Sequence, residues 1–90
     1  MGTTEKALRL LQSLETSQSN VSFSDLCRLA KMAGFSYDRQ KGSHKIYRHE
    51  KYPGIMNFQD VNGKAKPYQV KQLLAFIAEH DLIKKGVPRV

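Results

Sequence analysis

The sequence predicts an α+β domain in which helices cover one face of a three-stranded antiparallel sheet. Apolar residues recur at helical spacing near both ends of the chain, and residues of alternating polarity fill its middle. Short polar turns separate the alternating stretches, and strands joined by tight turns pair antiparallel. Ninety residues are enough for one domain and too few for two, so we expect a thin two-layer fold.

Each element follows from a local pattern. We expect a helix from Thr4 to about Leu14, a polar loop to Asn20 and a helix opening at Ser22. Three strands should follow, Phe35–Gln40, His44–His49 and Ile55 to about Gln59, with a break at residues 50–54 between the second and the third. A polar loop Asp60–Lys66 and a helix from Pro67 complete the order. Ser22 and Asp25 form an approximate capping box, and Gly34 suits the left-handed position after a helix. Pro67 fits the first position of a helix, so the last helix is expected to start there.

The distribution of charge favours a polyanionic partner. The chain carries fifteen Lys and Arg residues against eight Asp and Glu residues, a net charge of +7. Between Tyr37 and Lys71 there are eight basic residues and three acidic ones, which gives this segment a charge of +5. Nucleic acid fits such a segment, because each neutralised phosphate releases counterions. The alternative is that the lysines only keep a small domain in solution.

The sequence predicts neither a membrane location nor a disulfide. No apolar run approaches the roughly 18 residues of a membrane span, and the N-terminus lacks the pattern of a secretion signal. Cys27 is the single cysteine, which excludes an internal disulfide and suits a reducing compartment. We therefore expect a cytoplasmic protein.

The entry to the last predicted helix is basic, where an acidic or hydroxyl residue would stabilise it. Helix N-termini carry partial positive charge and unpaired N–H groups. Here Lys64 and Lys66 precede Pro67, and Lys71 follows in the second turn. A phosphate bound there could use both the N–H groups and the ammonium groups. The alternative is a poorly capped helix that the fold tolerates.

The predicted turn that ends at His44 is the main candidate for chemistry. Gly42 permits a tight turn, and Ser43 can donate a hydrogen bond to a phosphate. His44 begins the next strand between Lys41 and Lys45. Imidazole titrates near neutrality, and basic neighbours favour the neutral form that can accept a proton. RNA supplies its own nucleophile, the 2′-hydroxyl, so one proton acceptor can promote strand cleavage without a metal. On the residues alone, a purely structural histidine is the alternative.

Other residues give weaker signals. His49 lies on the opposite face of the same predicted strand from His44, and no pair of residues has the spacing of metal ligands. Tyr47 shares a strand face with Lys45 and could stack on a base or a ribose. Packing of Tyr47 against a neighbouring strand is an equal alternative. We therefore expect no metal and no cofactor.

The same residues carry a resemblance to the HicA family of toxins. A helix ends in Ala-Gly-Phe at residues 33–35, and residues 39–44 read Arg-Gln-Lys-Gly-Ser-His. Tyr-Gln-Val follows at residues 68–70, inside the last predicted helix. The Gly-Ser-His step after a short strand, taken with these neighbours, resembles the family over about residues 21–82.

The resemblance implies a function and a set of roles. It implies a fold similar to double-stranded-RNA-binding domains, metal-independent endoribonuclease cleavage of mRNA that inhibits translation, and silencing by a HicB-type antitoxin. His44 would be the catalytic residue, supported by a turn of Gly42 and Ser43. The residues expected to contact RNA are Arg39, Lys41, Lys45, Tyr47, Lys64, Lys66 and Lys71. The alternatives are a non-catalytic RNA-binding regulator and an interaction protein with an acidic partner.

The resemblance also divides the chain. Residues 21–83 would form the HicA-like core, after an N-terminal helix and loop at residues 1–20 and before a C-terminal tail at residues 84–90. The N-terminal helix precedes the family's usual core. In addition, Lys-Ala-Lys-Pro at residues 64–67 stands where the family commonly has a Pro-His-containing segment. Because of these two departures, the resemblance does not identify which surfaces of the chain bind RNA and the antitoxin.

Overall fold

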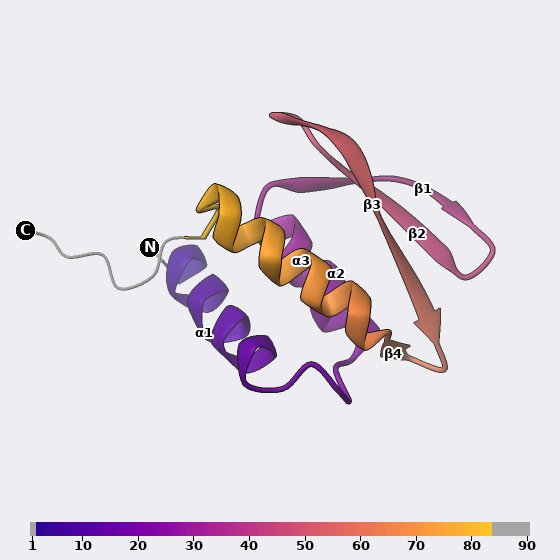
Figure 1. Cartoon of the computed structure of the whole chain (residues 1–90), viewed down its shortest axis with the longest axis horizontal. Helices are drawn as coiled ribbons and strands as arrows, with labels where there is room; N and C mark the ends of the chain where they lie inside the picture. The colour runs from indigo at the N-terminus through magenta and orange to yellow at the C-terminus, as the bar shows by residue number, and fades with distance from the viewer. Residues whose placement is uncertain (1, 84–90) are drawn as a thin grey trace, which may run out of the picture.

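The computed structural model describes residues 2–83, and the expected tail at residues 84–90 lies outside them. The elements, shown in Figure 1, are helix α1 (Gly2–Thr16), helix α2 (Phe23–Met32), strand β1 (Phe35–Lys41), strand β2 (His44–His49), strand β3 (Tyr52–Val61), strand β4 (Lys64–Ala65) and helix α3 (Pro67–His80). The α+β class and the antiparallel pairing are confirmed. None of the helices in the described part of the chain is long and apolar enough to cross a membrane.

The helices and the sheet form layers. The strands make one sheet in the order β1-β2-β3-β4, and α2 and α3 pack on the same face of it. Helix α1 contacts α2 and α3 on the side away from the sheet (Figure 1), so it adds a layer to the two that were expected. Fully buried side chains of the core include Leu26, Leu29, Phe58, Val70 and Leu73. The other face of the sheet, here called the open face, is not covered by any helix of residues 2–83.

The helix boundaries agree with their sequence signals. The Ser22 hydroxyl accepts a hydrogen bond from the Asp25 N–H at 3.1 Å, which caps α2. Gly34 follows α2 with a φ of +102°, a conformation that glycine adopts at little cost. Pro67 opens α3, where its missing N–H removes no helical hydrogen bond. Helix α1 spans 15 residues and is therefore longer at both ends than expected.

The sheet has four strands and not three, because the expected loop over residues 60–66 contains a hairpin. Asn62 and Gly63 have φ angles of +54° and +84°, the signature of a type I′ turn between paired strands. The Asp60 carboxylate accepts a hydrogen bond from the Gly63 N–H at 2.7 Å and so closes the turn. The expectation of an open loop was wrong.

The expected break at residues 50–54 is shorter than predicted. Only the first two of these residues form a turn, and β3 already begins at Tyr52. Pro53 and Gly54 lie where the β2–β3 register shifts. A proline is tolerated at such an irregularity, because its nitrogen does not have to donate to the ladder.

The close approach of Gly34 to His49 gives a testable prediction. A methyl group added at Gly34 would meet His49 Nε2 at 2.7 Å, and the φ of +102° is strained for any residue with a Cβ. Gly34→Ala should therefore lower the free energy of unfolding by about 2–4 kcal/mol, measured by chemical denaturation.

Gly54→Ala is the matched control for this prediction. Gly54 has a similar φ of +95°, but nothing lies within 4 Å of the added methyl group. It should therefore cost only the backbone strain, about 1–2 kcal/mol. Equal losses in the two variants would show that the contact with His49 does not restrict Gly34.

Candidate active site

The turn between β1 and β2 brings the Gly-Ser-His step to one end of the sheet. Lys41 and His44 face each other across a two-residue turn. Gly42 occupies the first turn position with a φ of +59°, where a type II′ turn needs glycine. His44 is the first residue of β2, so the expected start of this strand is confirmed.

One hydrogen bond orients the His44 imidazole. Its Nδ1 lies 2.7 Å from Oδ1 of Asn57, in the middle of β3. An amide oxygen only accepts hydrogen bonds, so Nδ1 carries the proton and the neutral ring keeps a lone pair on Nε2. Within residues 2–83, Nε2 has no hydrogen-bond partner. The arrangement leaves Nε2 able to accept a proton from a ligand.

His44 lies on the open face among polar and basic residues. Lys41 pairs directly with His44, and Arg39 and Asn57 pair with Ile46. Directly paired residues point to the same side of a sheet, and every second residue of a strand does so as well. The side chains that share this face are therefore Arg39, Lys41, His44, Ile46 and Asn57.

Asp38 neutralises part of the positive charge on this face. Its carboxylate forms an ion pair with Arg39 and a second one with Arg48 Nε at 3.0 Å. Lys41 has no carboxylate partner in the described chain and is exposed. It is therefore the cation beside His44 whose charge is available to an anionic ligand.

Lys45 and Tyr47 lie on the opposite, helix-covered face of β2. The Lys45 ammonium is 5.7 Å from the centre of the Phe23 ring. Tyr47 is 2% exposed and packs on Phe58 with ring centroids 5.6 Å apart. Burial, together with a hydrogen bond to Cys27, raises the pKa of the Tyr47 hydroxyl, and burial also raises the pKa of the Cys27 thiol. The Tyr47 ring has no exposed face on which a base could stack. It packs against a neighbouring strand, which was the alternative to RNA contact in the sequence analysis.

Helix α3 begins at the same end of the sheet as His44. Gln69, in the first turn of α3, is 3% exposed and its Oε1 accepts a hydrogen bond from the Gln59 N–H at 2.7 Å. Gln59 in turn pairs with His44 across β2 and β3. This partly buried hydrogen bond holds the start of α3 against β3, the strand whose Asn57 orients the imidazole.

The lysines around the start of α3 differ in their surroundings, and Lys64 lies in β4 and not in the expected loop. Lys66 is the N-cap of α3 and makes no side-chain capping bond, and the first turn contains no acidic residue. Lys71 is exposed. The Lys64 ammonium donates to Oδ1 of Asn20 at 2.7 Å, so part of its hydrogen-bonding capacity is already used. Helix α3 thus begins without a side-chain cap and without an acidic residue in its first turn.

The other two histidines contribute to packing at the far end of the sheet. His49 is 9% exposed, its Nε2 donates to the Ala33 carbonyl at 3.1 Å, and its Nδ1 accepts from the Lys51 N–H at 3.1 Å. His80 stacks on Tyr52 with ring centroids 4.1 Å apart. Both ring nitrogens of His49 are therefore committed to the fold. No three His, Cys, Asp or Glu residues among those described gather into a group that could hold a metal ion.

Comparison with known protein families identifies the family of this chain. The family model described as the HicA toxin of bacterial toxin–antitoxin systems matches residues 23–79. The chain belongs to the HicA toxin family. The HicA match begins at the first residue of α2 and includes the whole sheet, whereas α1 lies outside it. Membership of the HicA toxin family implies an antitoxin as partner. No curated protein and no solved structure matches the chain.

Asn57 was not among the site residues expected from the sequence. The signal that could have found it is the alternation of the third predicted strand, which places Ile55, Asn57 and Gln59 on one face. Only the register of β2 against β3 shows that this face is the one that carries His44.

Proposed function

We propose that this HicA family member is a metal-independent endoribonuclease toxin that cleaves mRNA through His44. The hydrogen bond of 2.7 Å between His44 Nδ1 and Asn57 is the observation that carries the proposal, because it leaves Nε2 as a proton acceptor on the open face. The net charge of +7 and the toxin family support it. The proposed compartment is the cytoplasm, and the proposed partner that silences the toxin is a HicB-type antitoxin.

The proposed reaction uses the RNA's own hydroxyl group. His44 Nε2 takes the proton from a 2′-hydroxyl, and the oxygen attacks the adjacent phosphorus. The bond from phosphorus to the 5′-oxygen of the next nucleotide breaks, and that oxygen takes a proton from water. Lys41, opposite His44 on the same face, stabilises the negative charge that develops on the phosphoryl oxygens. The products are a 2′,3′-cyclic phosphate and a 5′-hydroxyl.

The RNA backbone is proposed to follow the basic end of the sheet. The cations that would contact phosphates are Arg39, Lys41, Lys64, Lys66 and Lys71. Each would release counterions on binding. The start of α3, which no side chain caps, would add the partial positive charge of the helix N-terminus to the lysines. The order α2-β1-β2-β3-α3, with β4 inserted before α3, supports a likeness to double-stranded-RNA-binding domains.

The proposal predicts RNA cleavage in the presence of a chelator. Purified protein incubated with mRNA and excess EDTA should cleave it at the same rate as in magnesium buffer, since no step requires a metal. Labelling of the new ends should show a 5′-hydroxyl and a 2′,3′-cyclic phosphate. Cleavage that stops in EDTA and returns with magnesium or manganese would overturn the mechanism. Tight RNA binding with no cleavage in either buffer would favour a non-catalytic RNA-binding regulator.

A further inference from the structure

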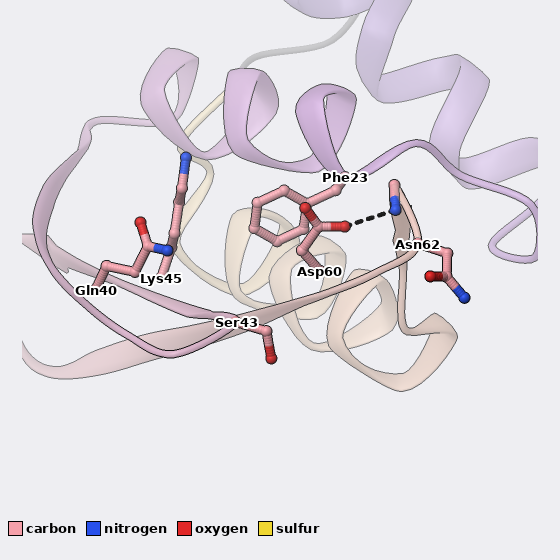
Figure 2. A pocket seen from close by; sticks show the side chains of 7 residues that line it. Phe23, Gln40, Ser43, Lys45, Asp60 and Asn62 are labelled. Carbon is pink, nitrogen blue, oxygen red and sulfur yellow. Dashed lines mark hydrogen bonds between the residues drawn. The ribbon is translucent and has the colours of Figure 1, made fainter.

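A hollow of about 210 Å³ lies between the start of α2 and the helix-covered face of the sheet. Figure 2 shows that its walls come from the β1–β2 turn, from the β3–β4 turn and from α2. The lining residues are Phe23, Gln40, Ser43, Lys45, Asp60, Asn62 and Gly63. At about 30 Å³ per water molecule, the hollow has room for roughly seven waters. It is thus of a size for one small planar group and too small for a larger ligand.

The hollow lies directly behind the proposed catalytic residue. Ser43, which lines it, precedes His44 in the chain. Asp60, which also lines it, donates its N–H to the Ser43 carbonyl at 3.0 Å, and the next pair along these strands is His44 with Gln59. His44 projects from the open face of this strand pair and the hollow opens on the other face. An RNA strand that passes over the end of the sheet can therefore place one nucleotide at His44 and a neighbouring base in the hollow.

The polar groups of the hollow fit a neutral base and not a phosphate. Asp60 Oδ1 accepts the Gly63 N–H at 2.7 Å, which fixes the carboxylate and leaves Oδ2 and the second lone pair of Oδ1 for a ligand. This negative group would repel a phosphate. Lys45 supplies a donor (Figure 2), and Phe23, which is 7% exposed and has the Lys45 ammonium 5.7 Å from its ring centre, supplies a small apolar contact. The hollow thus combines one acceptor-only group, one donor-only group and a small apolar contact.

We propose that this hollow binds a base of the RNA next to the cleaved step and that it selects guanine. Guanine carries two adjacent donors, N1–H and the 2-amino group, which match a carboxylate, and its O6 and N7 accept from an ammonium or amide group. Adenine and cytosine offer Asp60 only one exocyclic amino group. The proposal rests on the ribonuclease function proposed above, and it adds a specificity residue, Asp60, to that function.

The first test uses the wild-type chain. Short RNAs identical except for guanine, inosine or adenine at the position next to the mapped cleavage step are compared by their cleavage rates. Inosine lacks the 2-amino group, so it should be cut about tenfold more slowly than guanine, and adenine more slowly still. Equal rates for guanine and inosine would overturn the guanine site while leaving the ribonuclease function intact. Absence of cleavage in every RNA would instead contradict the ribonuclease function.

The second test changes Asp60. In Asp60→Asn the side-chain oxygen can still accept the Gly63 N–H, so the β3–β4 turn is kept, but an amino group now faces the guanine donors. This variant should cut the guanine and inosine RNAs at equal rates, while cleavage of the adenine RNA stays within a few-fold of wild type. Glu50→Gln removes the same charge at the opposite end of the sheet and should keep the guanine preference. An unchanged preference in Asp60→Asn would also overturn the site.

Discussion

Replacing His44 with alanine is expected to lower the rate of RNA cleavage by about 10²–10⁴-fold, because the variant lacks the group that accepts the 2′-hydroxyl proton. The side chain is half-buried and makes one hydrogen bond, to Asn57. Its loss should therefore cost at most about 1 kcal/mol of stability and a few degrees of melting temperature. RNA affinity should be nearly unchanged, since the backbone contacts are assigned to the basic side chains. Bacteria expressing His44→Ala should grow where those expressing the wild type arrest.

His49→Ala is the matched control, because it removes the same side chain from the other end of the same strand. The His49 imidazole is buried and holds both the Ala33 carbonyl and the Lys51 N–H. Its loss should lower the free energy of unfolding by about 2–4 kcal/mol. Cleavage per folded molecule should stay within a few-fold of wild type. If His44→Ala were the unstable variant and its activity followed the folded fraction, His44 would be a structural residue.

Replacing Asn57 with alanine is expected to reduce the cleavage rate by about 10–100-fold. A loss of this size is typical where a partner that orients a metal-bound imidazole is removed, and we expect the same effect on the orientation of His44. Without the Oδ1 acceptor, the His44 ring can rotate, and its proton can move to Nε2, the atom that has to accept the substrate proton. RNA affinity should be unaffected, because Asn57 is proposed to position His44 and not to bind RNA.

Asn57→Asp separates this positioning role from a merely structural one. A carboxylate beside Nδ1 favours the protonated imidazole, so the acidic limb of the pH–rate profile should move to higher pH by about one unit or more. Gln59→Ala is the control, since Gln59 occupies the same face and strand, and only its backbone N–H takes part in a hydrogen bond to α3. It should leave the profile in place. A profile that does not move in Asn57→Asp would remove Asn57 from the mechanism.

Local chemistry explains which elements the sequence predicted well. The Ser22 cap, the glycine after α2 and the proline at the start of α3 act within a few residues, so each could be recognised without the fold. Strand β4 could not, because its two residues depend on a distant partner as well as on their hairpin pairing with β3: the Ala65 N–H donates to the Val21 carbonyl at 2.9 Å. The Asn-Gly signal for a hairpin was present, but two residues are too few to show alternation.

The same difference between local signals and distant contacts applies to the candidate active site. His44 and Lys41 could be paired from the sequence, because a two-residue turn fixes their register. The partnership with Asn57 depends on the β2–β3 register, which shifts near Pro53 and so cannot be counted from the turn. Tyr47 was ambiguous for another reason: alternation shows that two residues share a face, and it does not show which face the helices cover.

The most direct test of the central claim is single-turnover cleavage of a defined RNA, in EDTA, by the wild type and by His44→Gln. Glutamine keeps a hydrogen-bonding group at this position but cannot accept a proton at neutral pH. Both proteins should melt at nearly the same temperature and bind the RNA equally. The wild type should produce 5′-hydroxyl and 2′,3′-cyclic phosphate ends, and His44→Gln should produce none above background. Cleavage by a folded His44→Gln variant at the wild-type rate would contradict proton transfer by His44.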